Sequence, residues 1–126
     1  MEISLISPRL VIQKKDFLGS GVPYWPIELA TFAAFLREKK YDVRMFDLFG
    51  NNPKKLIDKG THYLQGENIT KYIPELKSND AIIIFAISYM SHNEITEIIK
   101  SIRRSIKDIP IFILENSQAV TAYSVQ

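Results

Sequence analysis

The sequence predicts an α/β domain built on a parallel sheet, and three observations support this. Residues 81–87 (AIIIFAI) and 110–114 (PIFIL) are continuous apolar runs, which are typical of parallel strands covered on both faces. Residues 41–49 instead alternate polar and apolar side chains, which favours a strand at the edge of the sheet. Helical patterns separate the strands, so we expect right-handed crossover connections.

The first half of the chain predicts a strand, a long loop and a helix. The strand is expected at residues 2–7, because Pro8 cannot donate a hydrogen bond to a neighbouring strand. A loop of about 17 residues follows, and a loop of that length usually has a binding or lid role. Pro26 suits the first turn of a helix ending near residues 37–40. We expect this helix to be mostly buried, because apolar residues recur at helical spacing: Leu29, Phe32, Ala33 and Leu36.

The second half predicts an amphipathic helix over residues 91–108. Ser91 followed three residues later by Glu94 is a capping-box signature, which marks the start of a helix. The isoleucines of this segment share one helical face, and they are Ile95, Ile98, Ile99, Ile102 and Ile106. The preceding residues 52–79 are less regular. Residues 69–76 have helical spacing, but Pro74 should interrupt the helix.

Together these elements predict a doubly wound parallel sheet of the Rossmann or flavodoxin-like type, with the strand order 2-1-3-4. A fifth strand is missing, unless the tail at 115–126 or a partner supplies it. Otherwise the strand at 110–114 has an exposed edge that favours pairing with another chain. We expect residues 1–126 to form a single domain that corresponds to the amino-terminal part of a longer protein.

Composition excludes several classes of function. The net charge is only +2, and basic pairs are interleaved with acidic residues, so neither nucleic acid nor a membrane is an expected partner. The chain has no cysteine, which excludes disulfides, thiolate metal sites and an iron–sulfur cluster on this chain. No metal-ligand set is expected either. Without a signal-peptide layout or a long apolar stretch, the expected location is the cytoplasm.

Ligands of such sheets bind beyond the carboxyl ends of the strands. Neither a Walker loop nor a dinucleotide fingerprint fits Gly19 and Gly21, because no lysine follows them and they lie far from the first strand. These glycines are interpreted as a hinge. His92 is expected at this edge as a solvated residue or, alternatively, a ligand contact, and His62 as a surface residue. Tyr24 and Trp25 are expected either to roof a flat ligand or to pin the loop to the core.

Three long stretches carry a resemblance to a known family. They are residues 23–47 (PYWPIELATFAAFLREKKYDVRMFD), 79–90 (NDAIIIFAISYM) and 109–125 (IPIFILENSQAVTAYSV), and they follow a short first segment, SLISP, at residues 4–8. With this layout the chain resembles the cobalamin-binding domain at the amino terminus of many radical S-adenosylmethionine enzymes. The resemblance implies cobalamin as the cofactor. It also implies an accessory role beside a radical catalytic domain, because that chemistry needs a cysteine-ligated cluster that this chain cannot hold.

The family's ligand residues transfer unevenly. The D-x-H-x-x-G motif of related domains corresponds to residues 47–52, where Phe49 replaces the histidine, so the resemblance implies binding without a histidine ligand. The S-x-L motif that contacts the nucleotide tail is similar to Ser88-Tyr89-Met90. The double glycine after the fourth strand appears as Glu115-Asn116, a departure that places side chains where the tail would lie. The implied cofactor-binding residues are Ser7, Asp47, Gly50, Ser88, Tyr89, Met90 and Asn116.

An alternative stays open beside cobalamin binding. A degenerate copy of the fold, with its channel filled by Phe49, Tyr89 or Glu115, would act as a structural or protein-interaction module. Its partner would be a catalytic domain or another chain that completes the sheet.

Overall fold

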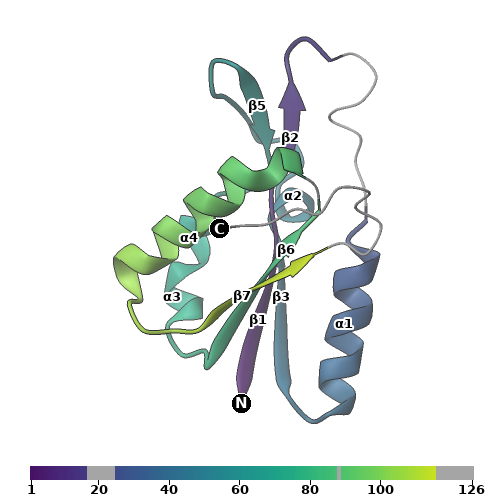
Figure 1. Cartoon of the computed structure of the whole chain (residues 1–126), viewed down its shortest axis with the longest axis vertical. Coiled ribbons are helices and arrows are strands. Elements are labelled where there is room, and N and C mark those ends of the chain that lie inside the picture. Colours follow the sequence, from purple (N-terminus) through teal and green to yellow (C-terminus); the bar gives the residue numbers. More distant parts are fainter. Residues whose placement is uncertain (17–24, 88, 116–126) are drawn as a thin grey trace.

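The computed structural model describes residues 1–16, 25–87 and 89–115, with the backbone alone at Tyr89. Figure 1 shows a main sheet and, beyond the carboxyl ends of its strands, a smaller sheet. The described elements follow in the order β1 (Glu2–Ser7), β2 (Leu10–Gln13), α1 (Ile27–Glu38), β3 (Asp42–Asp47), α2 (Leu48–Asn51), β4 (Leu56–Asp58), β5 (His62–Gln65), the 3₁₀ turn η1 (Ile69–Tyr72), α3 (Ile73–Leu76), β6 (Ala81–Ala86), the 3₁₀ turn η2 (Tyr89–Ser91), α4 (His92–Ser105) and β7 (Ile111–Glu115).

The main sheet is parallel, and its four strands follow the order β3-β1-β6-β7. This is the predicted order 2-1-3-4, so the α/β class and the parallel sheet are confirmed. The apolar strand β6 and the strand β1, whose side chains are buried from Ile3 to Ser7, occupy the centre of the sheet. The other apolar run, β7, departs from the expectation that both of its faces are covered, because it lies at the end of the strand order and its Phe112 is 56% exposed. In β3, Val43 and Phe46 are buried while Asp42 and Arg44 are exposed, as expected of an edge strand. The tail beyond Glu115, which is one of the two sources considered for a fifth strand, lies outside the described residues.

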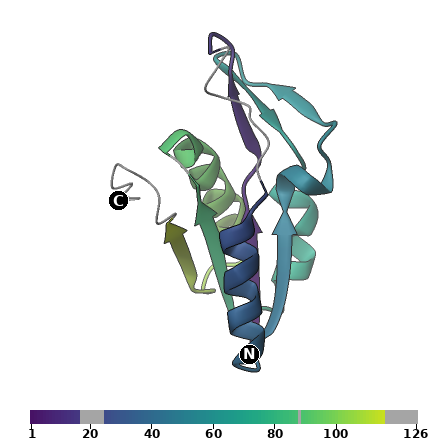
Figure 2. The same ribbon diagram turned by 90° about the vertical axis from the view of Figure 1, so that its right-hand side faces the viewer.

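Helices cover both faces of the main sheet. α1 lies in front of the sheet in Figure 2, and α4 lies behind it. On one face, Leu29 and Leu36 of α1 pack with the buried side chains of β1 and β3. On the other face, α4 packs against β6 through Ile95, Ile98 and Ile102, and Ile73 and Leu76 of α3 belong to the same cluster. Each face therefore has its own hydrophobic cluster, and the sheet holds the two clusters apart.

The expectation that α1 is mostly buried is wrong. Ile27 is 69% exposed and Phe35 is 51% exposed, so only a narrow stripe of the helix reaches the core. The reason is that α1 packs over β1 and β3, while its flank toward β7 borders a groove that Phe32 and Phe35 line together with Leu114. Trp25, which precedes the helix, is 85% exposed and does not pin the chain to the core.

The small sheet was not predicted, because part of it lies in the segment that was expected to be a loop. Pro8 does end β1, but two residues later β2 begins and pairs antiparallel with β5, which in turn pairs with β4. These strands have only three or four residues each. Such short segments do not show a clear alternation of polar and apolar side chains. In addition, the strand that pairs with β2 lies about fifty residues away along the chain.

Pro74 interrupts the helical segment at 69–76, as predicted. A 3₁₀ turn covers Ile69–Tyr72, and a single α-helical turn with Pro74 in its first turn covers Ile73–Leu76. The ring of a proline is tolerated there because the first amide groups of a helix have no intrahelical acceptor. The segment still packs on the core, since Ile69, Ile73 and Leu76 are buried.

Candidate functional site

A cavity of about 670 Å³ lies beyond the carboxyl ends of β1 and β6. At this point the strand order reverses, because the chain leaves β1 for β3 on one side and returns to β6 on the other. Such a switch point is where open parallel sheets bind ligands. The cavity is lined by Val11, Gln13, Lys14, Lys15, Gly60, Thr61, His62, Met90, Asn93 and Glu94. The small sheet therefore forms one wall, and η2 with the first turn of α4 forms the other.

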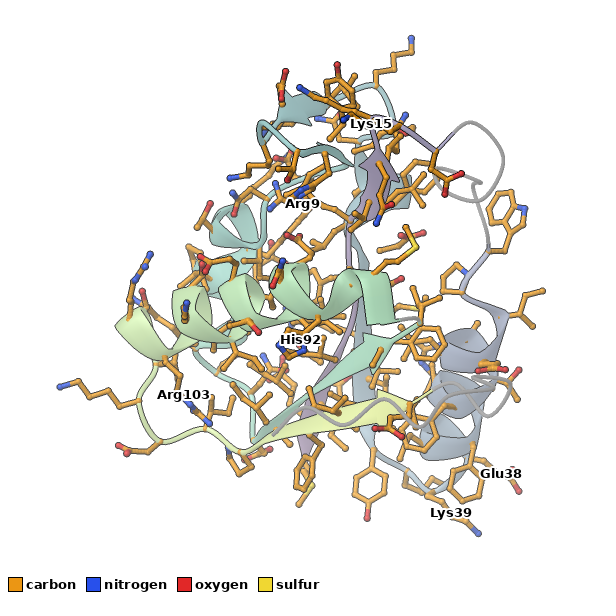
Figure 3. The ribbon with its side chains drawn as sticks, turned by 45° about the horizontal axis from the view of Figure 1, so that its top comes forward. Arg9, Lys15, Glu38, Lys39, His92 and Arg103 are labelled. Carbon is orange, nitrogen blue, oxygen red and sulfur yellow. The ribbon has the colours of Figure 1, made fainter. Side chains whose placement is uncertain are left out.

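A buried ion pair joins these two walls. Arg9, between β1 and β2, donates from Nε to Glu94 Oε1 over 2.6 Å and from Nη2 to Oε2 over 3.0 Å. The side chains are only 7% and 1% exposed, and Arg9 lies between the small sheet and α4 in Figure 3. The third nitrogen, Nη1, is also buried and donates to no described acceptor. The pair holds the segment that follows β1 against the helix that follows β6.

The predicted capping box at the start of α4 is wrong. Ser91 precedes the helix, but its side chain makes no capping hydrogen bond. Glu94 instead accepts hydrogen bonds from Arg9 at both of its carboxylate oxygens. The sequence held one signal of this role, since Glu94 is in line with Ile98 and Ile102 on the apolar face of the helix. An acidic residue in such a stripe needs a buried partner.

Two lysines of the β2 end stand at the mouth of the cavity. Lys14 Nζ lies 2.7 Å from Asp58 Oδ1 and 4.8 Å from the centre of the Tyr63 ring. The hydrogen bond with Asp58 raises the pKa of Lys14. The same bond, helped by the amide of Gly60, lowers the pKa of Asp58, so both groups are charged at neutral pH. Lys15 is exposed and makes no ion pair with any described side chain.

His62 lines this cavity, whereas the sequence pattern indicated a surface residue. It is half-buried in β5, and its Nδ1 lies 3.0 Å from the Thr61 hydroxyl. Nothing in the residues around His62 signals this position, because the cavity exists only once β5 pairs with β2. His92, the first residue of α4, is half-buried and does not line the cavity.

Three of the implied cofactor residues lie together at the carboxyl ends of β1 and β3. Ser7 is buried and faces Asp47 in the register of the two strands. Asp47 Oδ1 accepts a hydrogen bond of 3.0 Å from the amide of Gly50 and so caps α2. A Cβ at Gly50 would collide with the Asp47 carboxylate. None of the three lines the cavity at the switch point.

The remaining implied residues are divided. Met90 lines the switch-point cavity, and Tyr89 begins the turn η2. Ser88 and Asn116 lie outside the described residues. The proposed hinge at Gly19 and Gly21 lies outside them as well, as does Tyr24.

A second hollow, the α1–β7 groove, lies where α1 begins and β7 ends. It has a volume of about 390 Å³ and is lined by Ile27, Glu28, Thr31, Phe32, Phe35, Leu114 and Glu115. Most of this lining is aliphatic or aromatic, which suits a flat apolar group. Glu115, in the place of the family's first glycine, is exposed at the end of β7. Its side chain therefore borders the α1–β7 groove rather than packing into the core, and a cobalamin nucleotide tail remains compatible with the residues present.

Other kinds of site find no support in the part of the chain that the structure describes. Within residues 1–16, 25–87 and 89–115, no three histidine or acidic side chains cluster as metal ligands do. No helix in those ranges has the length and apolar character needed to cross a bilayer.

Comparisons with models of protein families, with curated proteins and with solved structures found no match for this chain.

Proposed function

We propose that this chain is a cobalamin-binding domain of the doubly wound type that serves a radical S-adenosylmethionine catalytic domain. The observation that carries the proposal is the α1–β7 groove, which ends at Leu114 and Glu115. The resemblance places the nucleotide tail of cobalamin beside this point, at residues 88–90 and 115–116. The strand order β3-β1-β6-β7 supports the same reading, because it puts β6 and β7 next to each other with their carboxyl ends at one edge.

The proposed binding site combines apolar side chains in the groove with polar residues at the carboxyl ends of the strands. Phe32 and Leu114 offer apolar walls for the flat base of the tail. Asp47 and Gly50 lie at the same edge of the sheet, beside Ser7. Phe49 stands where related domains have a histidine, so the protein offers no imidazole to the metal at that position. Bound cobalamin supplies methyl-transfer or redox chemistry, while the protein binds and orients it.

Titration with hydroxocobalamin tests the proposal. Binding should change the visible absorbance of the ligand and retain it on the protein during gel filtration. A Leu114→Trp variant fills the α1–β7 groove and should weaken binding by about tenfold or more, which corresponds to about 1.4 kcal/mol. Leu56→Trp is the matched control, because Leu56 is 54% exposed on β4. Absence of retention at high micromolar ligand, or equal effects of the two variants, would refute cobalamin binding in this groove.

A second candidate, a protein-interaction module, is favoured by the exposed side of β7. Among the described strands β7 pairs only with β6, so its other backbone edge has no partner within residues 1–16, 25–87 and 89–115. Phe112 on this strand is 56% exposed, and Ile27 and Phe35 of α1 are exposed on the same side of the groove. An open edge bordered by large apolar side chains is a typical site for pairing with another chain.

A further inference from the structure

We propose that the switch-point cavity binds a small phosphorylated organic molecule of about nucleotide size. This inference does not rest on cobalamin binding, because the cavity and the α1–β7 groove have no lining residue in common. Its volume of about 670 Å³ lies within the usual range for small-molecule sites.

The charges that line the cavity favour an anion. Its cationic side chains are Lys14 and Lys15, and Glu94 is its acidic side chain. The charge of Glu94 is neutralised by Arg9, which binds it through two nitrogens. The charge of Lys14 is balanced by Asp58, which leaves Lys15 without a compensating described acid. The cavity therefore carries a net positive charge.

The start of α4 adds to the positive character of the cavity. The first turn of α4, which contributes Asn93 and Glu94, carries the positive end of a fourteen-residue helix, and Ser91 does not cap it. Independently, Arg9 is more than nine-tenths buried behind Glu94, and its Nη1 has no described acceptor. Arg9 does not itself line the cavity, so it favours an anion there only by neutralising Glu94, which does line it.

The cavity is too large and too mixed in character for an inorganic ion alone. Val11 and Met90 supply apolar surface, while Gln13, Thr61 and the lysines supply polar contacts. A phosphate fits the cationic part, because lysine and a helix start are both common phosphate partners. The apolar part suits the organic remainder of the same molecule, such as a base or a short acyl chain.

Isotope-labelled protein of residues 1–126, titrated with AMP, adenosine and inorganic phosphate, tests this inference by NMR. AMP should bind more tightly than either fragment and should shift the amides of Lys15, Gly60, Thr61 and Asn93. Lys15→Gln should weaken AMP binding by about tenfold, since it removes the uncompensated cation. Lys77→Gln is the matched control, because Lys77 is an exposed lysine outside this cavity.

Three outcomes of the AMP titration would overturn the inference. They are chemical-shift changes spread over many lysines, equal losses of AMP affinity in the two lysine variants, and binding of inorganic phosphate that is as tight as that of AMP. Hydroxocobalamin titration of Lys15→Gln separates the two sites. Retained cobalamin binding with weakened AMP binding supports independent sites, whereas equal loss of both ligands would indicate one shared site and refute this assignment.

Discussion

Arg9 and Glu94 lie 85 positions apart in the sequence and form a buried ion pair with two hydrogen bonds. Removing both charges from water is costly, so such a pair contributes little net stability compared with apolar side chains of the same size. Its effect is on geometry. The pair fixes the link between β1 and β2 against the first turn of α4, and residues of β2 and of that first turn line opposite walls of the switch-point cavity.

Glu67 is the second acidic residue that the tertiary structure places in a polar cluster. Its Oε1 lies 2.7 Å from Lys55 Nζ and 2.9 Å from the amide of Asn68, while Asn52 donates to Oε2. The hydrogen bond from Lys55, followed by those from Asn68 and Asn52, lowers the pKa of Glu67 from 4.5 to about 2. The ionised carboxylate therefore stabilises the folded state.

The lowered pKa of Glu67 predicts an acid-dependent contribution to stability. It is fully present above about pH 4.5, the unfolded value, and is lost as the pH falls toward 2. Glu67→Gln should therefore reduce the free energy of unfolding at pH 6, and its deficit relative to the unmodified chain should shrink between pH 4.5 and 2. Urea unfolding at several pH values measures this, with the exposed Glu97→Gln as control. A deficit that does not vary with pH would contradict the assignment.

At the scale of elements, Gly66 determines how the small sheet joins the main one. It follows β5 with φ = 132°, a conformation that other residues rarely adopt. A Cβ there would lie 2.5 Å from the Leu48 carbonyl oxygen and 2.8 Å from Phe49 Cα. The backbone of α2 thus packs directly on this glycine, and Glu67 continues the contact by donating its amide to Leu48.

Gly66→Ala should destabilise the protein by more than the strain of about 1–3 kcal/mol expected for its backbone conformation, because the clash is with backbone atoms. Gly60→Ala is the matched control. Gly60 also has a positive φ, 88°, but a Cβ there meets nothing within 4 Å. Urea unfolding of both variants measures the difference. Equal losses of stability would show that α2 moves away from the added methyl group at little cost.

At the scale of the whole molecule, the apolar surface is unevenly covered. The α4 face of the sheet buries its isoleucines, but the α1 face leaves Phe112, Phe35 and Ile27 exposed beside the open edge of β7. Association through this side would bury that surface and pair the free edge.

Sedimentation velocity over a range of concentrations tests this association. The unmodified chain should form dimers or larger species as its concentration rises, and Phe112→Lys should shift it toward monomer, because a lysine at the interface would be desolvated. Leu56→Lys, an exposed position on β4, should have no effect. A chain that stays monomeric at every concentration would count against self-association through β7.

Most of the main sheet was predictable because its signals are local. The apolar runs of β6 and β7, the alternation of β3 and the isoleucine stripe of α4 each lie within one element. The small sheet was not predictable, because β2 is recognisable as a strand only from its pairing with β5. His62 lines the cavity because of the same pairing. The capping box predicted at Ser91 does not form, and Glu94 instead bonds to Arg9, which is distant in the sequence.

The sequence by itself determined the α/β class, the strand order and the edge of the main sheet at which ligands are expected. Periodicity within short segments and the rule for crossover handedness suffice for those conclusions. Only the tertiary structure decided which side chains meet at that edge, the pairing of Arg9 with Glu94 and the exposure of the flank of α1 toward β7. These features depend on contacts between residues far apart in the chain, and no local pattern encodes such contacts.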